Sequence, residues 1–255
     1  MPRLSGNAGG QNADMPLSAV VLDIEGTTSA TAYLLNHLYP YSAERLGDWI
    51  EHHRHEPDVA RAVEQVRELI GDPAAGLGPV TAALLRWLAE DQKVTPLKTV
   101  QGRIWAEGFA RGDLVAHFYP DVIPARRGWK AAGLALYVFS SGSVTAQHAW
   151  FGHSPEGDLR QLLSGYFDTA NAGPKRAASS YRKITAAIAA APGRTVFLSD
   201  VSAELDAARV AGWHTVGVRR TSEPHYAHGV RDHLEIASFA DLDLSGNHPA
   251  AGSHQ

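Results

Sequence analysis

The sequence predicts an α/β protein: a Rossmann-like parallel sheet with a helical domain inserted after its first strand. Three observations support this fold class. Short apolar runs such as 20–22 each end in polar residues, as the buried strands of parallel sheets do. In the second half of the chain, helix-like segments alternate with these runs, which favours parallel strands joined by right-handed crossovers. Between residues 34 and 111, apolar residues recur only at helical spacing.

The first predicted strand, 20–22, ends in Asp23, and Glu25 and Gly26 follow. Open α/β sheets bind ligands at the carboxyl ends of their strands, so Asp23 would stand at a functional edge. Successive side chains of a strand point to opposite faces. Asp23 and Glu25 therefore converge on one site only if the chain bends after Asp23, and Gly26 makes that bend easier. The alternative is a strand end followed by a polar turn.

The insertion is predicted to contain four helices, the second of which stops at Gly71, before Asp72 and Pro73. The apolar residues that define the four helices are Leu34, Leu35, Leu38, Leu46, Trp49 and Ile50; Val59, Val63, Val66, Leu69 and Ile70; Val80, Leu84, Trp87 and Leu88; and Val100, Ile104, Trp105 and Phe109.

After the insertion, the sequence alternates between strands and helices. Helices are expected at 124–129, 144–150 and 179–190, and Ser202 is interpreted as the N-cap of another. Arg219 and Arg220 follow the last strand and are interpreted as surface charge. The strands are predicted at 134–139, 166–169, 195–198 and 214–218.

Composition excludes several classes of protein. The 255 residues are 44% hydrophobic, enough for a sizeable core, and no run of 18 apolar residues predicts a membrane-spanning helix. A net charge of −4 without a dense Lys/Arg stripe provides no electrostatic case for nucleic acid. The absence of cysteine excludes disulfides and thiolate metal sites. We expect a soluble, cytoplasmic protein.

Polar side chains of complementary kinds follow three of the predicted strands. Asp23 follows the first strand, Ser140 and Ser141 follow the second, and Asp200 follows a later one. Because the carboxyl ends of parallel strands share one edge, we expect these residues to meet. Carboxylates that meet repel each other unless a cation joins them, and oxygen ligands suit Mg²⁺. Serine hydroxyls and Lys175 suit a phosphate, and the combination implies phosphoryl transfer through an aspartyl-phosphate.

Five segments carry a family resemblance: LDIEGTT at 22–28, YVFSSGSV at 137–144, FGHS at 151–154, GDL at 157–159 and SYRKI at 180–184. The chain resembles the haloacid-dehalogenase-like (HAD-like) phosphatases and, among them, the enolase-phosphatase family of methionine salvage, also called acireductone synthases. The wider superfamily usually has Asp where Glu25 stands, so this residue discriminates the family. The resemblance covers residues 18–240.

The resemblance implies a metal site with one Mg²⁺ per chain. Asp23 corresponds to the nucleophile and a Mg²⁺ ligand, and Asp200 to the remaining Mg²⁺ carboxylate. Glu25 stands at the position of a second metal contact, which the superfamily often makes through the backbone carbonyl.

The resemblance also implies a phosphate site. Ser140 and Ser141 correspond to the phosphate-binding pair, and Lys175 to the lysine that pairs with the phosphate and the nucleophile. Lys183 is a rival for that role, although its predicted helix favours a solvated surface position. Glu204 lies close to Asp200 in the sequence and is interpreted as a first-turn acid stabilised by the helix dipole.

The reaction that the resemblance implies has two parts on one substrate, 2,3-diketo-5-methylthiopentyl-1-phosphate. The diketone is enolised by loss of a proton from the carbon that bears the phosphate ester. The phosphate is then hydrolysed, which yields acireductone (1,2-dihydroxy-3-keto-5-methylthiopentene). We hypothesise that Glu25 is the enolisation base, because an enolate leaving group needs less protonation than an alkoxide. The alternative is that Glu25 only supports the metal site.

Two other functions stay open at this point. One is a generic capped, Mg²⁺-dependent HAD phosphatase of another small phosphoester; the other is a non-enzymatic phospho-acceptor module, which ranks last because such modules are shorter and lack the insertion. The predicted organisation is a disordered leader (1–16), a HAD-like core (17–33 and 116–244), a helical cap (34–115) and a disordered tail (245–255). The resemblance suggests a monomer.

Overall fold

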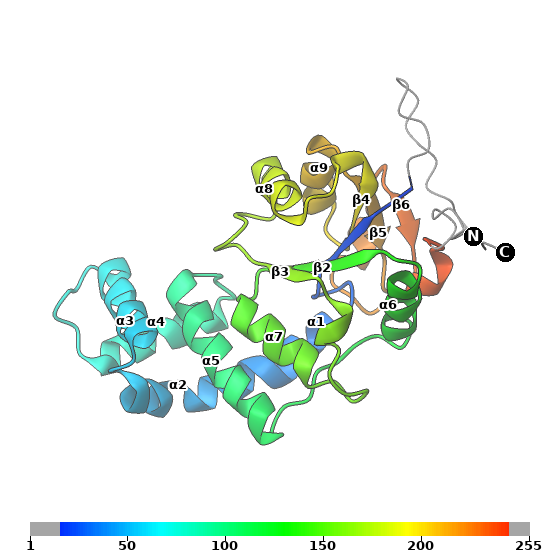
Figure 1. Cartoon of the computed structure of the whole chain (residues 1–255). Coiled ribbons are helices and arrows are strands. Elements are labelled where there is room, and N and C mark those ends of the chain that lie inside the picture. The colour runs from blue at the N-terminus through cyan, green and yellow to red at the C-terminus, as the bar shows by residue number, and fades with distance from the viewer. Residues whose placement is uncertain (1–15, 245–255) are drawn as a thin grey trace. The chain divides into compact units, whose positions relative to one another are not determined.

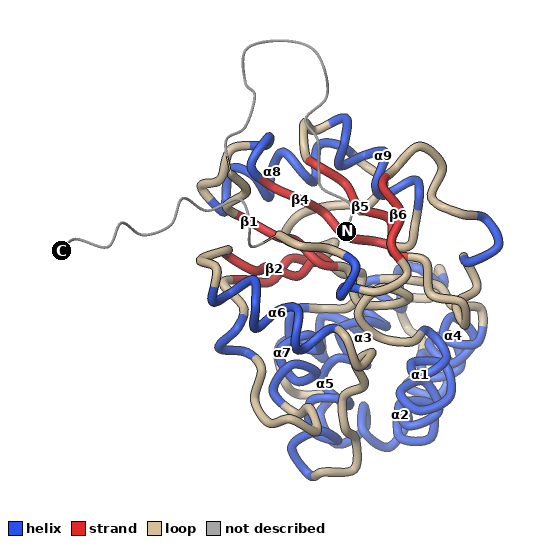
Figure 2. The backbone as a smooth tube through the Cα atoms, turned by 90° about the vertical axis from the view of Figure 1, so that its right-hand side faces the viewer, coloured by secondary structure: helices blue, strands red, loops and turns tan. Residues whose placement is uncertain are grey.

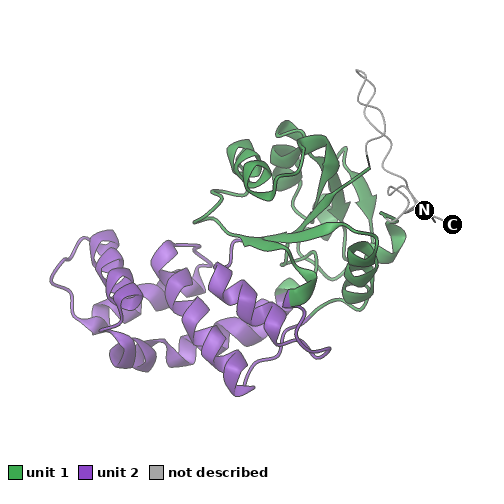
Figure 3. Ribbon diagram, viewed as in Figure 1, with its two compact units in different colours: residues 1–31, 118–140, 161–255 green, residues 32–117, 141–160 purple. Residues whose placement is uncertain are grey.

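The computed structural model describes residues 16–244, so the predicted disordered tail and all of the predicted leader but Pro16 lie outside the described residues. The chain divides into two compact units (Figure 3). The core unit comprises the chain up to Thr31, Phe118–Ser140, and the chain from Gln161 onward. The helical unit comprises Ala32–His117 and Ser141–Arg160. No helix within 16–244 is long and apolar enough to cross a membrane.

The core unit contains a six-stranded sheet in which all neighbouring strands are parallel, which confirms the predicted fold class (Figure 1). Its strand order is β3-β2-β1-β4-β5-β6, and Figure 2 shows the strands in red. The strands are β1 (Ala19–Leu22), β2 (Ala135–Phe139), β3 (Gly165–Phe167), β4 (Thr195–Ser199), β5 (His214–Val218) and β6 (Leu234–Ile236). The sequence analysis missed β6, because a run of three residues with a central glutamate carries no strand pattern.

The side of β1 on which successive strands are added changes at the centre of this sheet. The chain continues from β1 outward to β2 and β3, and then returns to the other side of β1 to form β4, β5 and β6. In register, Leu22 of β1 is paired with Leu198 of β4, so Asp23 and Ser199 come next on neighbouring strands. Such a reversal point is where parallel α/β sheets bind their ligands.

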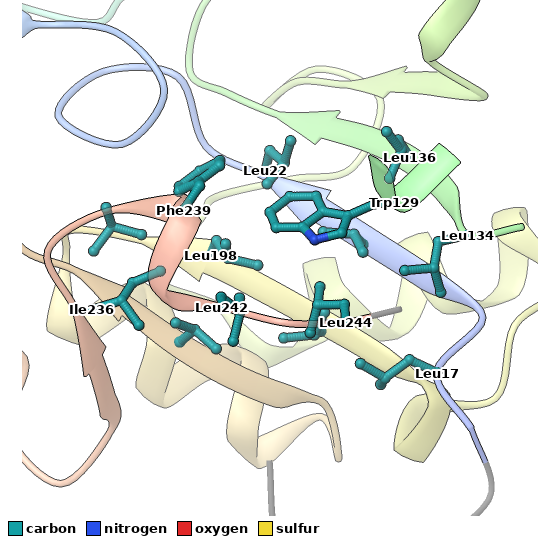
Figure 4. Packing of buried hydrophobic residues seen from close by; sticks show 14 of the residues in the cluster. Leu17, Leu22, Trp129, Leu134, Leu136, Leu198, Ile236, Phe239, Leu242 and Leu244 are labelled. Carbon is teal, nitrogen blue, oxygen red and sulfur yellow. The ribbon is translucent and has the colours of Figure 1, made fainter. Parts of the chain in front are cut away.

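Apolar side chains cover both faces of the sheet. On one face, Val20 belongs to a cluster with Trp129 of α6 and Phe239, shown in Figure 4. On the other face, Val21 belongs to a cluster with Tyr181 of α8. Because β1 and β4 are fully buried, the polar residues that follow them are held by a close-packed scaffold. The helices of the core unit are α6 (Val122–Ala131), α8 (Ala178–Ile188) and α9 (Ser202–Val210), with short 3-10 turns at Pro192–Arg194, Tyr226–His228 and Phe239–Asp241.

Helix α9 differs from the prediction at its N-terminus. Ser202 is the first residue of the helix rather than its N-cap, and Val201 precedes the helix without a side-chain capping bond. The Ser202 hydroxyl donates instead to the Gly229 carbonyl at 3.0 Å. The hydroxyl therefore bonds to a residue 27 positions away in the sequence instead of capping the helix.

The four predicted helices of the insertion are present in the helical unit. The first predicted helix begins with a π-helical segment (Leu34–Leu38) and continues as α2, and the sequence analysis did not anticipate the wider π turn. Helix α3 ends at Gly71, as predicted, and Gly71 adopts the left-handed conformation. The helices are α1 (Thr31–Tyr33), α2 (Tyr39–His53), α3 (Pro57–Ile70), α4 (Leu77–Ala89), α5 (Thr95–Arg111) and α7 (Val144–Gly152), and 3-10 residues Arg160–Leu162 follow.

The helical unit also includes 141–160, a segment that the predicted boundaries placed in the core. Its helix α7 packs along α5: the rings of Phe109 and Trp150 lie 6.0 Å apart, and a Cβ on Gly102 would meet the Ser143 hydroxyl at 2.4 Å. A helix between two predicted strands is expected to cover the sheet. The contacts of α7 with α5 show instead that α7 belongs to the helical unit.

Candidate active site

Asp23 lies directly after the central strand β1 and is 3% exposed. Its backbone N–H donates to the Leu198 carbonyl at 3.0 Å, which continues the ladder between β1 and β4 by one residue. Its Oδ1 accepts from the Ile24 N–H at 2.7 Å. The sheet therefore fixes both the backbone and one carboxylate oxygen of Asp23.

Lys175 contacts Asp23 directly. Its Nζ lies 2.6 Å from Oδ1 of Asp23 and 2.7 Å from Oε2 of Glu204, and its side chain is almost fully buried. The Tyr181 hydroxyl donates to the Lys175 carbonyl at 2.7 Å, which fixes the loop that precedes α8. The rival Lys183 is exposed on α8. The structure therefore brings Lys175, and not Lys183, to the predicted nucleophile.

Asp200 follows β4 and lies beside the turn after β1. Its backbone N–H donates to the Thr27 hydroxyl at 3.1 Å. Gly26 has φ +72°, and a Cβ at this position would lie 2.2 Å from Oδ2 of Asp200. Only glycine combines this backbone conformation with such a close approach, so Gly26 both turns the chain and leaves room for the Asp200 carboxylate.

Ser199 and Glu204 complete the buried network, and the sequence analysis gave neither a role in it. The Ser199 hydroxyl lies 3.1 Å from Oε2 of Glu204 and 3.3 Å from Oδ2 of Asp23, so it can donate to either carboxylate. It also accepts from the Val201 N–H at 3.1 Å. Glu204 does occupy the first turn of α9, but its carboxylate pairs with Lys175. A sequence signal for the role of Glu204 was available: it follows Asp200 by four residues, which places both carboxylates near the start of α9.

Burial and mutual repulsion dominate the electrostatics of these groups. Burial raises the pKa of Asp23 to about 6, against the opposing effect of Lys175. Burial, followed by the charge of Asp23, raises the pKa of Asp200 to about 8. Burial alone would lower the pKa of Lys175, but the charges of Asp23 and Glu204 raise it above its ordinary value. One lysine thus does not neutralise three buried carboxylates.

The other predicted site residues adjoin this network along the chain. Glu25 is half-buried in the turn, where its backbone bridges to Ser29. Ser140 is buried at the end of β2, the neighbour of β1, and its N–H donates to the Phe167 carbonyl at 3.1 Å. Ser141 is half-buried and is the first residue of the segment that belongs to the helical unit. The interactions described above join Asp23 to Lys175 and place Asp200 against Gly26 and Thr27 of the turn after β1. Glu25, Ser140 and Ser141 are located by their strand ends and turns.

The two aspartates have the chemistry of a divalent cation site. Within 16–244, no three side chains of His, Cys, Asp or Glu are grouped so that they alone could hold a metal ion. Asp23 and Asp200, however, are two buried carboxylates, and burial raises the pKa of both. Hard oxygen donors of this kind fit Mg²⁺, which usually takes one or two protein carboxylates and completes its shell with other oxygens.

Comparisons with known proteins identify the relatives of this chain. No family model matches the chain. The chain is 57% identical over 229 residues to enolase-phosphatase E1 of Streptomyces avermitilis, covering 90% of this chain and 96% of the relative. It is 54% identical to enolase-phosphatase E1 of Frankia alni (87% and 93% covered) and 48% identical to that of Pseudomonas aeruginosa strain LESB58 (89% and 99% covered).

Solved structures show the same fold. The UTR4 protein of Saccharomyces cerevisiae superimposes with a TM-score of 0.72 at 28% identity, covering 89% of this chain and all of that one. CbbY of Rhodobacter sphaeroides, in complex with phosphate, has a TM-score of 0.55 at 18% identity (89% and 96% covered). The L-2-haloacid dehalogenase of Xanthobacter autotrophicus has a TM-score of 0.52 at 17% identity (88% and 96% covered). The core unit therefore has the HAD-like fold.

Proposed function

The chain belongs to the enolase-phosphatase family, and from this membership and the site geometry we propose that it converts 2,3-diketo-5-methylthiopentyl-1-phosphate into acireductone and phosphate in methionine salvage. The observation that carries the proposal is the buried contact of 2.6 Å between Asp23 and Lys175, beside a second buried aspartate. Lys175 also pairs with a third acid, Glu204, so a purely structural ion pair would not need Asp23. The arrangement therefore suits a role for Asp23 as a carboxylate nucleophile.

Asp23 acts as the nucleophile. A carboxylate oxygen of Asp23 attacks phosphorus, the bond between phosphorus and the substrate oxygen breaks, and the enolate that leaves takes up a proton to become acireductone. Water then attacks the phosphorus of the aspartyl-phosphate, which releases inorganic phosphate and restores the carboxylate. Lys175 holds Asp23 in place and stabilises the negative charge on the phosphoryl oxygens.

Asp23, Asp200 and the backbone carbonyl of Glu25 would hold one Mg²⁺ per chain. When bound, Mg²⁺ supplies positive charge for the phosphoryl oxygens and for the two aspartates. Ser140 lies at the end of the strand beside β1, which supports a phosphate-binding role for Ser140 and Ser141. The helical unit is proposed to serve as the cap that excludes water.

Glu25 is proposed as the base that removes the proton in the enolisation. The glutamate in place of the usual aspartate motivates this assignment, and its half-buried position in the turn after β1 leaves it near the reacting end of the sheet. A Glu25→Gln variant should lose enolisation, and one that enolises the diketone at the wild-type rate would show that Glu25 only supports the metal site. The proposal further includes a monomeric state and a cytoplasmic location.

The experiment follows the diketone phosphate with purified protein and Mg²⁺. One signal reports released phosphate, and the other reports the ultraviolet absorbance of the conjugated enediol. Both products should appear together, and both should be lost in Asp23→Asn. Turnover of unrelated phosphoesters alone would instead indicate a generic HAD phosphatase.

A further inference from the structure

We propose that Arg220 is a positioning residue for the active site, which holds the turn after β1 in place against Asp200. The inference rests on the proposed function, because it concerns the same site. Its effect on the site passes through the backbone of Thr27, whose carbonyl accepts from the guanidinium group.

The interpretation of Arg219 and Arg220 as surface charge is wrong for Arg220. Its side chain is 8% exposed, whereas the neighbouring Arg219 is half-buried and pairs with Glu235 at 3.1 Å. An arginine is almost never buried unless it is paired, so the surroundings of Arg220 must supply acceptors for its guanidinium group.

The guanidinium group of Arg220 joins three separate segments of the core unit. Its Nη1 donates to both carboxylate oxygens of Asp121, at 2.9 and 3.0 Å, and to the Ala237 carbonyl at 3.2 Å. Its Nη2 and Nε donate to the Thr27 carbonyl at 3.2 and 3.4 Å. The planar group also lies 4.3 Å above the Tyr119 ring. A planar fork with donors in fixed directions suits such a junction, and a lysine cannot reproduce it.

Asp121, the acidic partner of Arg220, is itself held in place by hydrogen bonds. Besides Arg220, its Oδ2 accepts from the Phe239 N–H at 2.6 Å and from the Ser238 hydroxyl at 2.9 Å. Burial would raise the pKa of Asp121, but these hydrogen bonds and Arg220 together lower it, so the carboxylate stays charged. The ion pair is therefore anchored to the packed face of the sheet that includes Phe239.

Thr27 links Arg220 to the active site. Its carbonyl accepts from Arg220, while its hydroxyl accepts from the Asp200 N–H at 3.1 Å. Both contacts belong to one buried residue next to Gly26, where the Asp200 carboxylate already approaches the backbone closely. A shift of the Thr27 carbonyl would thus change how the turn after β1 meets Asp200, and with it the spacing of the two aspartates.

Neighbouring contacts anchor the same turn. The Tyr119 N–H donates to the Thr28 carbonyl at 3.0 Å, and the Tyr119 hydroxyl donates to Glu223 at 2.5 Å. Glu223, which is buried, also accepts from the Thr31 N–H at 3.1 Å. These bonds hold the two segments where the chain leaves and re-enters the core unit, whereas Arg220 contacts Thr27, whose hydroxyl accepts from the Asp200 N–H.

The test compares Arg220→Lys with Arg219→Lys, the same substitution at the adjacent arginine, whose partners Glu235 and the Tyr226 carbonyl lie outside the turn. Arg220→Lys keeps a positive charge beside Asp121 but cannot bind Asp121 and the Thr27 carbonyl together. The readouts are Mn²⁺ affinity, from the electron paramagnetic resonance signal of the free ion, and separate kcat and KM values for the diketone phosphate. Circular dichroism melts establish that each variant is folded.

Arg220→Lys should weaken Mn²⁺ binding by about 10- to 100-fold and lower kcat, with a smaller change in KM, as losing an outer support of a metal site does. Arg219→Lys should match the wild type. Thr27→Val removes the hydroxyl contact with Asp200 and should also weaken Mn²⁺ binding. In a double-mutant cycle, the loss from Arg220→Lys should shrink in the Thr27→Val background.

Several results would overturn the inference. A folded Arg220→Lys variant with wild-type Mn²⁺ affinity and kcat would do so. An equal loss of Mn²⁺ affinity in Arg219→Lys would also do so, as would losses from Arg220→Lys and Thr27→Val that add fully in the double variant. If Arg220→Lys does not fold, wild-type Mn²⁺ affinity in Thr27→Val would refute the link to Asp200. A wild-type protein that binds no Mn²⁺ and releases no phosphate would refute the proposed function itself, and this inference with it.

Discussion

Gly26→Ala should lower the kcat/KM of the enzyme by about 100-fold while leaving it folded. Two effects follow from the structure. The backbone of Gly26 has φ +72°, which costs an alanine about 1 kcal/mol. The new Cβ would also lie 2.2 Å from Oδ2 of Asp200, where ordinary contacts begin near 3.4 Å, so the turn and the carboxylate must separate by roughly 1 Å.

Gly71→Ala provides a matched control. Gly71 has φ +73° at the end of α3, and a Cβ there would meet nothing within 4 Å. Both variants should therefore lose about 1 kcal/mol of stability, which corresponds to a melting temperature lower by about 2 to 4 °C. Only Gly26→Ala should lose kcat/KM, by about 100-fold, because a displacement of roughly 1 Å costs that much at a reacting centre.

The assay measures phosphate release from the diketone phosphate at saturating Mg²⁺, together with thermal melts of both variants. If Gly26→Ala matched Gly71→Ala in kcat/KM, the close approach of Gly26 to Asp200 would have no functional consequence. The reasoning that the turn sets the spacing of the carboxylates would then be refuted.

Three further predictions follow from the charges of the core unit. Lys175→Met should lower kcat by about 10²- to 10³-fold, while Lys183→Met leaves it unchanged; equal losses in the two variants by steady-state kinetics would contradict the assignment. Because the pKa of Asp200 is raised to about 8, a metal ion must displace its proton at lower pH, so Mg²⁺ affinity measured by calorimetry should rise between about pH 6 and pH 8 with proton release, by up to about tenfold per unit. A flat affinity across that range would count against Asp200 as a ligand. His233 is buried between Asp206 and β5, and burial lowers its pKa despite Asp206, so in mildly acidic solution the unfolded chain binds a proton that the folded chain does not. The free energy of unfolding should therefore fall as the pH drops below about 6.5. In urea titrations, the free energy of unfolding of His233→Asn should change less steeply with pH than that of the wild type.

Five of the six strands of the described sheet, and the position of Asp23 at the end of β1, could be predicted because their signals are local. Asp23 follows the apolar run 20–22, and the later strands predicted at 134–139 and 195–198 are largely apolar runs that polar residues follow. The choice of Lys175 over Lys183 was also local, since helical periodicity placed Lys183 on an exposed face. What the periodicity could not show is the 2.7 Å contact between Lys175 and Glu204, which depends on how α9 begins after β4.

Other features depend on residues far apart in the chain. Arg220 is buried because Asp121 and Thr27 meet it from segments 99 and 193 residues away, and no property of the pair Arg219 and Arg220 distinguishes the two. Likewise, 141–160 belongs to the helical unit because α7 packs on α5, although its place between two strands favoured a position on the sheet. Tertiary partners, rather than local propensity, decided both outcomes.

The proposed mechanism requires that Asp23 form a covalent aspartyl-phosphate. The most direct test mixes the enzyme with the diketone phosphate and Mg²⁺, quenches the reaction in acid within milliseconds, and reduces the protein with borohydride, which converts an aspartyl-phosphate into homoserine. Peptide mass spectrometry should find homoserine at position 23, and neither unreacted protein nor Asp23→Asn should contain it. Phosphate turnover with position 23 unmodified throughout the first turnover, or with homoserine at another aspartate, would contradict the account.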